Sequence, residues 1–516
     1  MTGLSVEQLH SRAIALVDKF NKWGETSVID EAIVLDREAL ELCPPGHPER
    51  DLSLVSLAIH VSNRYHQLGA VADLEEAIIL DREALDLRPQ GHPGRSMSLN
   101  NLALHLSSRY KQLGAIEDLE EAIVLSREAL DHCPQGHPDR SMSLNSLARH
   151  LASRYEQLED IEDLEAAIVL AREELSLYPQ GHPDRSMSLY NLALHLSSRH
   201  KELGEMGDLD EAIVFGREAF NLSPEGHPDR PLCLTNLAAD LSSRYEQLRA
   251  AEDLDEAIVL AREALNLCPQ GHPDRLMTLN NLNLHLSARH EQLGAIEDLD
   301  EAIVFGREAL NLPPQDYLER SMCLNNLAVD LSSRYKKIGA IENLEEAISL
   351  DREALALRPS GHPDRSQSLN NLAGHLFSRY KQLGSMQDVE EAIVLERKAL
   401  KLRSRRHPER AMSLNNLLNY LSSRYKELGA IRDLQEAIVL GREAVKLCPI
   451  GHPDRLMSLS SLAAYLLDRY DRIGKSKDLD RAIVLGREAL AFCPRGHPNR
   501  SQISDNLRRM NVARGS

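Results

Sequence analysis

Asparagine recurs on one predicted helix at intervals of 45 residues or a multiple of 45. A carboxamide offers a hydrogen-bond donor and an acceptor, so a row of them can hold the backbone of an extended peptide. The same side chains can instead bond to the neighbouring repeat and fix helix stacking, and both interpretations stay open. The members of this asparagine series are Asn101, Asn191, Asn236, Asn281, Asn326, Asn371 and Asn416.

Histidine recurs four residues after the asparagine position, which places it on the same face of a helix. Asp or Tyr replaces it in four repeats, so the position is polar throughout. This histidine series predicts either the solvated wall of a groove or further ligand contacts. The series contains His60, His105, His150, His195, His285 and His375, and the ligand contacts expected from it are His105, His195, His285 and His375.

Arginine occupies two positions of the repeat, one on each of two predicted helices. Exposed ion pairs contribute about 0–1 kcal/mol, which is a weak reason for such regularity. We expect the second-helix arginines, from Arg37 to Arg487, to pair with Asp or Glu of a neighbouring repeat. The first-helix arginines are more open to a ligand role. The ligand contacts expected from them are Arg109, Arg199, Arg289 and Arg379.

A third group of histidines belongs to the tripeptide Gly-His-Pro. Zn–N bonds of about 2.0–2.1 Å require the ligands of one ion to lie within about 4 Å of each other. Successive tripeptides are separated by a whole helix pair, so we expect a turn role, no metal and no cofactor. The tripeptide begins at Gly46, Gly91, Gly136, Gly181, Gly226, Gly271, Gly361, Gly451 and Gly496.

Catalytic motifs are absent from the sequence: it has no phosphate-binding glycine loop, no helical His-Glu-x-x-His and no nucleophile elbow. Serine and histidine are frequent, but they fill each repeat alike and do not build one unique site. The expected function is therefore not enzymatic.

All these residues are positioned by a unit of 45 residues that repeats without insertion or deletion. A period of this length is typical of a solenoid, in which each unit buries its apolar face on its neighbours. We predict an all-α solenoid of eleven antiparallel helix pairs plus one C-terminal cap helix. Residues 1–45 are expected to form a divergent N-terminal capping repeat, residues 46–495 ten tandem repeats, and residues 496–516 a half-repeat with the cap helix.

The first helix of each unit, helix A, carries an apolar stripe and is expected to end at a glycine. Steps of three and four residues define one helical face. Gly114 can adopt the left-handed conformation that ends a helix, although Glu159 and Arg249 replace this glycine in two units. The stripe consists of Leu99, Leu102, Leu106, Tyr110 and Leu113.

The second helix, helix B, is predicted to begin with a capping box. Asp118 would be the N-cap, and Glu121 follows three residues later. Residues 122–125, Ala-Ile-Val-Leu, are apolar on more than one side, which suits a helix packed between its partner and the next repeat. Pro134 ends the helix because the residue before a proline avoids the α region.

Composition narrows the class of partner. The net charge of −19 disfavours nucleic acid and anionic membrane surfaces. No apolar run approaches the ~20 residues needed to span a bilayer, and no secretory signal is visible. The seven cysteines are odd in number, and equivalent positions of stacked helices lie about 8–10 Å apart, too far for a disulfide. We expect reduced thiols and a cytoplasmic location.

Charge is unevenly divided within a unit. Residues 91–115 contain Arg95, Arg109 and Lys111 and no acid, whereas residues 116–135 contain six acids and one arginine. If helix A lines the inside of the solenoid, a peptide of acidic or neutral character suits it.

The motif Asn-Leu-Ala at 101–103, with Tyr110, Ala122, Ala129 and Pro134, resembles the tetratricopeptide pattern. The long units are similar to those of the kinesin light chain and to arrays of fungal proteins with a caspase-like CHAT domain. The resemblance implies a right-handed superhelix whose helix A lines the concave face, where the asparagine series would hold an extended peptide.

The expected function is a protein-interaction scaffold that binds extended peptides or a partner domain along helix A. One alternative is a regulatory array detached from a protease-like effector domain. Another is a structural array that associates weakly with itself. The expected partner is a protein or peptide, not nucleic acid or membrane.

Overall fold

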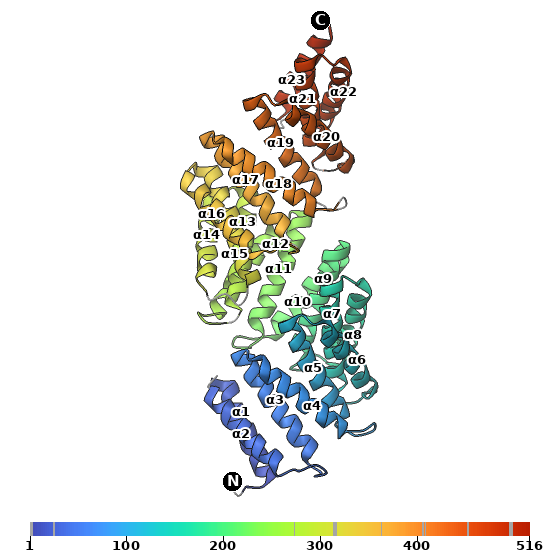
Figure 1. The fold of residues 1–516 in the computed structure, drawn as a ribbon. Coiled ribbons are helices and arrows are strands. Elements are labelled where there is room, and N and C mark those ends of the chain that lie inside the picture. The colour runs from blue at the N-terminus through green and yellow to red at the C-terminus, as the bar shows by residue number, and fades with distance from the viewer. Residues whose placement is uncertain are drawn as a thin grey trace. The chain divides into compact units, whose positions relative to one another are not determined.

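The computed structural model describes residues 4–23, 26–272, 274–312, 317–362, 364–404, 407, 409–450, 452, 454–494 and 499–515. These residues contain 23 α-helices and no strand. The chain divides into two units, residues 1–267 with α1–α12 and residues 268–516 with α13–α23 (Figure 1).

The first unit contains six antiparallel helix pairs, with helix A at odd and helix B at even numbers. Its helices are α1 Val6–Trp23, α2 Thr26–Glu41, α3 Arg50–Leu68, α4 Val71–Asp86, α5 Arg95–Leu113, α6 Ile116–Asp131, α7 Arg140–Leu158, α8 Ile161–Leu177, α9 Arg185–Leu203, α10 Met206–Leu222, α11 Arg230–Leu248 and α12 Ala251–Leu267.

The second unit contains five pairs and the lone helix α23, so the prediction of eleven pairs and a cap helix is confirmed. Its helices are α13 Arg275–Leu293, α14 Ile296–Asn311, α15 Tyr317–Ile338, α16 Ile341–Leu357, α17 Arg365–Leu383, α18 Met386–Leu402, α19 Arg410–Leu428, α20 Ile431–Leu447, α21 Arg455–Ile473, α22 Ser476–Phe492 and α23 Arg500–Gly515.

The apolar stripe of helix A forms the core, as the spacing predicts. Leu99, Leu102 and Leu106 are buried, whereas Leu113 at the end of the helix is exposed. The prediction that residues 122–125 are buried on more than one side is wrong for Val124, which is 62% exposed. Helix B packs against the core through Ala122 and Ile123. The next position of the helix, Val124, points outward.

Helix B begins earlier than the capping box predicts. Helix α6 starts at Ile116 with Ala115 as its N-cap, and the backbone N–H of Asp118 donates to the carbonyl of Ala115 at 3.1 Å. The Asp118 carboxylate is instead held by Arg109, with N···O distances of 2.7 and 2.6 Å. The capping-box prediction is therefore wrong, because a charged partner on helix A takes the carboxylate.

The expected left-handed end of helix A is confirmed. Gly114 has φ 73°, and its N–H donates to the carbonyl of Tyr110 at 2.7 Å. Glu159 and Arg249 adopt the same conformation with φ 57° and 56°. A side chain in this region costs about 1–2 kcal/mol relative to glycine.

Glu159→Gly is expected to stabilise the turn between α7 and α8 by about 1 kcal/mol, because it removes this conformational cost. Since repeat proteins open locally, amide hydrogen exchange of residues around this turn should slow about fivefold. Gly114→Glu should speed exchange at the equivalent turn between α5 and α6. Unchanged exchange in both variants would contradict the prediction.

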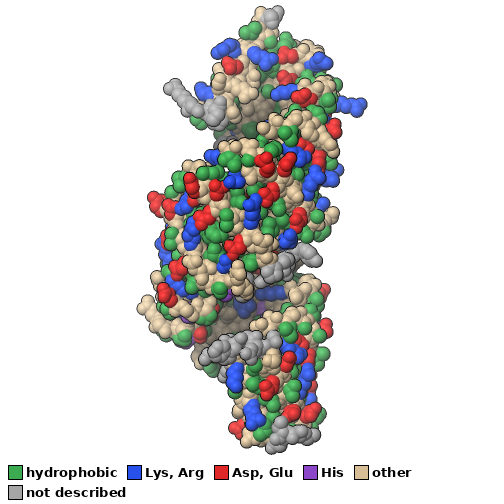
Figure 2. All heavy atoms as spheres, turned by 90° about the vertical axis from the view of Figure 1, so that its left-hand side faces the viewer, with side chains coloured by type: hydrophobic (Ala, Val, Ile, Leu, Met, Phe, Trp, Pro, Cys, Tyr) green, Lys and Arg blue, Asp and Glu red, His purple; other side chains and the backbone are tan. Residues whose placement is uncertain are grey.

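Ionic side chains of both signs are interspersed on the face of the molecule drawn in Figure 2. None of the helices in the described part of the chain has the length and apolarity needed to cross a membrane.

Candidate functional site

The helix-B arginines connect consecutive repeats. In seven pairs, arginine meets the glutamate 39 residues later, on the next helix B, at 2.5 to 2.9 Å. The expected inter-repeat pairing is confirmed for these members. The pairs are Arg37–Glu76, Arg82–Glu121, Arg172–Glu211, Arg217–Glu256, Arg307–Glu346, Arg352–Glu391 and Arg397–Glu436.

The helix-A arginines tie the two helices of one repeat together. Nε and Nη2 of Arg109 donate to the two carboxylate oxygens of Asp118, nine residues later, and this bonding raises the pKa of Arg109. The ligand role expected for them is therefore not supported, because an internal carboxylate already occupies these donors. The four candidate residues form the pairs Arg109–Asp118, Arg199–Asp208, Arg289–Asp298 and Arg379–Asp388.

The histidine series is buried between helices, so its interpretation as a solvated groove wall is wrong. His105, His195 and His285 are 3–4% exposed and His375 is 8% exposed. A side chain at this depth presents little surface to a ligand, although His375 still lines a pocket along helix A. The ligand role of these four residues stays a prediction.

Each histidine of the series faces the helix B before it, at the residue 24 positions earlier. His105 Nδ1 lies 2.6 Å from a carboxylate oxygen of Asp81, and His375 Nδ1 lies 2.6 Å from Asp351. Ala171 precedes His195 by the same interval. Burial lowers the pKa of His195 to about 4. An aspartate 24 residues before the histidine, as in Asp81 and His105, is a pattern in the sequence that indicates this contact, and sequence reasoning did not use it.

The asparagine series is half-buried at all seven positions, Asn101 to Asn416. Asn416 donates to Asn370 Oδ1 at 3.0 Å, a bond to the adjacent repeat. The amide nitrogens of Asn101, Asn236 and Asn326 have no hydrogen-bond partner among the described residues. The stacking interpretation is therefore supported at Asn416, and because those three nitrogens are shielded from solvent, the ligand role of the series stays a prediction.

Hydrogen bonds between stacked helices A come more regularly from the residue immediately before each member of the asparagine series. Asn100 donates to Ser143 at 2.9 Å, and Asn325 donates to Ser368 at 3.2 Å. Asn415 accepts from Ser458 at 3.1 Å. Each bond joins consecutive helices A. Because these residues already fix the stacking, a ligand role for the asparagine series itself stays open. Sequence reasoning did not separate the two positions.

Helices A approach each other more closely than helices B. In the second unit α15 contacts α13 and α17, and α19 contacts α17 and α21, whereas consecutive helices B are bridged by long arginine and glutamate side chains. Helices A of the second unit therefore contact one another directly. That helix A lines a concave face stays a prediction.

A polar groove runs along helix A in the second unit. One pocket of about 290 Å³ lies among α15, α17 and α19, and another of about 270 Å³ lies among α19, α21 and α23. The second is the first displaced by two repeats, since Lys336 and Asn371 of the first correspond to Lys426 and Ser461 of the second. Key lining residues of the two pockets are Lys336, Asn371, Lys381, Asn416, Asn419, Lys426, Ser461 and Gln502. Sequence reasoning missed the three lysines.

The Gly-His-Pro histidines have the expected turn role. Nδ1 of His92, His137 and His182 accepts the backbone N–H two residues later at 3.1 to 3.2 Å. Gly451 and residues 495–498 lie outside the described residues.

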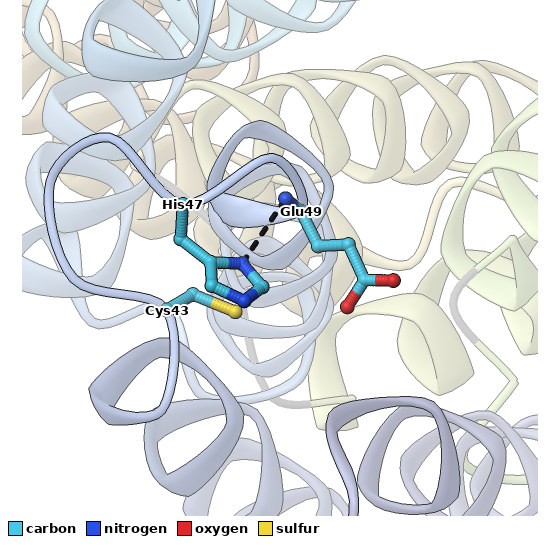
Figure 3. A group of neighbouring side chains, drawn as sticks. All are labelled: Cys43, His47 and Glu49. Carbon is cyan, nitrogen blue, oxygen red and sulfur yellow. Dashed lines mark hydrogen bonds between the residues drawn. The ribbon is translucent and has the colours of Figure 1, made fainter.

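In the first turn, donor atoms of Cys43, His47 and Glu49 lie within 4.8 Å of one another (Figure 3). Distance argues against a metal held by histidines from different Gly-His-Pro turns. It does not argue against one held by Cys43, His47 and Glu49, which belong to one turn. His47 Nδ1 accepts the N–H of Glu49 at 3.2 Å, so Nε2 is the ring nitrogen open to an ion. Thiolate, imidazole and carboxylate are zinc ligands. The same hydrogen bond, from the backbone N–H two residues later to Nδ1, occurs at His92, His137 and His182. The turn role therefore explains the presence of His47 without a metal.

All seven cysteines are buried and have free thiols, as the sequence predicts. Burial raises the pKa of Cys233 and Cys323. The neutral thiol is therefore favoured at these positions.

Three segments of the chain match the family model of the tetratricopeptide repeat: residues 95–139, 232–274 and 320–364. No curated protein matches the chain.

Solved structures with similarity to the chain include the human IFIT1 dimer with PPP-AAAA, at 15% identity over 94% of each chain and a TM-score of 0.46. Yeast Tom70 is 17% identical over 97% of this chain and 96% of its own, with a TM-score of 0.33. A Podospora anserina protein described as a kinesin light chain with nearly identical TPR-like repeats is 21% identical, over 42% of this chain and 98% of its own, with a TM-score of 0.31.

The relation to fungal CHAT-domain arrays stays a prediction. The three matched segments lie in the same 45-residue register as the remaining units. These three segments are therefore similar to the tetratricopeptide repeat, and the other units of the chain share their period.

Proposed function

We propose that the helix-A groove of the second unit binds extended peptides of acidic or neutral character, and that the protein is a non-enzymatic scaffold of the cytoplasm. The observation that carries this proposal is the groove itself, which recurs with the repeat and is lined by carboxamides and lysines. The net charge of −19 supports a protein partner over nucleic acid.

The spacing of the groove suits an extended chain. Packed helices lie about 8–10 Å apart, and an extended peptide advances about 3.3 Å per residue. One asparagine of the series would therefore meet about every third residue of the ligand. Asn371 lines the first pocket, where its carboxamide can donate to a peptide carbonyl.

Lysine gives the groove its preference for charge. Lys336, Lys381 and Lys426 occupy one position of three consecutive helices A and line the two pockets. Carboxylates of a ligand would meet these ammonium groups, whereas a basic peptide would be repelled.

Replacing Asn326, Asn371 and Asn416 together by Ala is expected to weaken a peptide selected on the full chain at least tenfold, because each lost hydrogen bond costs about 1 kcal/mol. The peptide is selected by display on the wild-type protein, and affinities are measured by calorimetry.

A matched control replaces Asn221, Asn266 and Asn311 by Ala, three exposed asparagines on helix B. It should leave the affinity unchanged. Equal binding by wild type and the helix-A triple variant would refute recognition by the asparagine series. Selection of basic peptides alone would refute the proposed charge preference.

A further inference from the structure

The series of Arg–Glu pairs between consecutive helices B is interrupted at Arg127, where Ala166 stands 39 residues later, and again at the end of the array. Arg442 on α20 stands at the position that pairs in the preceding repeats, but the residue 39 positions later is Arg481, not glutamate. In the preceding repeat Arg397 meets Glu436 at 2.7 Å. Neither Arg442 nor Arg481 has an ion pair among the described residues, so no ionic bridge closes the space between α20 and α22 here.

A pocket of about 500 Å³ opens at this interruption, among α20, α21 and α22. Cations form its rim and aliphatic side chains its floor. The rim contains Arg442, Lys446, Arg469, Lys475, Lys477, Asp478 and Arg481. The floor contains Val445, Leu462, Leu466 and Leu485.

The cations of this basic pocket are not neutralised by the protein. Its single acid, Asp478, is bound by Arg469 at 2.7 Å. On α20, Glu436 pairs with Arg397 of the preceding repeat, and Glu443 pairs with Arg410 of the same repeat. The other five rim cations therefore face solvent in a chain whose net charge is −19.

The basic character arises from charge changes in the last two repeats. Lys477 stands where positions 297 and 342 hold glutamate and where the preceding repeat already has Arg432, and Lys475 replaces an alanine found at 295 and 340. Arg481 replaces the glutamate found at 436. Because the fold of the repeat does not require these cations, their accumulation indicates a ligand.

We propose that the basic pocket binds an acidic peptide segment in which carboxylates flank an aliphatic residue. A carboxylate of the ligand would take the place of the missing glutamate beside Arg442, in the pairing that Arg397 makes with Glu436. A second carboxylate would meet Lys475 or Lys477, and the aliphatic side chain would cover Leu462 and Leu466. This site lies between helices B and is separate from the helix-A groove.

The test uses a fluorescein-labelled peptide Glu-Glu-Leu-Glu-Glu and the full chain, with affinity measured by fluorescence anisotropy at low ionic strength. Arg481→Glu is expected to weaken binding at least tenfold, because it removes a cation and supplies the glutamate that pairs with Arg442. Since glutamate occupies this position in other repeats, the melting temperature should be unchanged or higher. The peptide Gln-Gln-Leu-Gln-Gln should bind at least tenfold more weakly than the acidic peptide.

Lys398→Glu is the matched control. It makes the same change in charge on α18, outside the pocket, at a position that is glutamate in the neighbouring repeats. It should alter the affinity less than twofold. Binding by Arg481→Glu within twofold of wild type would overturn the proposal, as would an equal loss in Lys398→Glu. Loss in Lys381→Glu without loss in Arg481→Glu would also overturn it and would assign the peptide to the helix-A groove.

Discussion

Replacing Glu396 by Gln is expected to raise the free energy of unfolding by about 3 kcal/mol at pH 8 and to leave it nearly unchanged at pH 4.5. Glu396 lies on α18 and is fully buried. Burial raises the pKa of its carboxyl group to about 7, although the Ser413 hydroxyl and Arg403 act in the opposite direction.

The sign follows from proton binding. The ordinary pKa of a glutamate is 4.5, so between pH 4.5 and 7 the folded protein binds more protons at this group than the unfolded chain does. Its contribution to stability is complete below pH 4.5 and is lost as the pH rises through 7. Glutamine does not ionise, so the variant escapes this loss.

Urea unfolding of wild type and variant at pH 4.5, 6 and 8, followed by circular dichroism, measures the difference. Other titrating groups, such as the buried His285, are common to both proteins and cancel. Glu390→Gln on the exposed side of the same helix should show no such dependence. A difference between Glu396→Gln and wild type that is constant with pH would show that the carboxyl titrates normally.

Replacing Arg88 by Cys is expected to cost about 3 kcal/mol, even though cysteine occupies this position in five other repeats. Arg88 is 2% exposed. It donates to Asp51 at 2.7 Å, to the carbonyl of Gly94 at 2.9 Å and to Ser98 at 3.0 Å. The substitution leaves the mostly buried Asp51 carboxylate without this cation.

Asp51→Ser is expected to restore much of the stability lost in Arg88→Cys. In the repeat that contains Cys133, the position equivalent to Asp51 is Ser96, so the double variant reproduces a natural combination. A double-mutant cycle by urea unfolding should give a coupling free energy of about 2 kcal/mol. Additive effects of the two substitutions would contradict a specific Arg88–Asp51 interaction.

The period of 45 residues was sufficient to predict the helices, their pairing and the cap. Apolar spacing identified Leu99, Leu102 and Leu106 as core, and the glycine at 114 identified the end of helix A. These features depend on residues near in sequence, whose relative positions a helix fixes. The same reasoning was wrong at Asp118, where a side chain on another helix competes for the carboxylate.

Partners across repeats were predicted unevenly. The helix-B arginines were correctly expected to pair between repeats, but the helix-A arginines were expected to be open to ligands and are bound by aspartate. The histidine series was interpreted from polarity alone. An aspartate 24 residues earlier on the preceding helix B holds His105 and His375, but alanine stands at that position before the equally buried His195 and His285. The burial therefore follows from packing between helices, which periodicity within one helix does not reveal.

The sequence by itself determined the repeat, the two helices of each unit and the residues that face the core, because short-range helical geometry governs all three. The tertiary structure decided which polar positions remain open to a ligand. That outcome depends on which charged side chains lie opposite each other on neighbouring helices. Most arginines are neutralised by an acid from their own or the next repeat, whereas the position that would supply a glutamate to Arg442 holds Arg481. Exposure of a polar side chain is a property of the packed array, and the repeat pattern alone does not contain it.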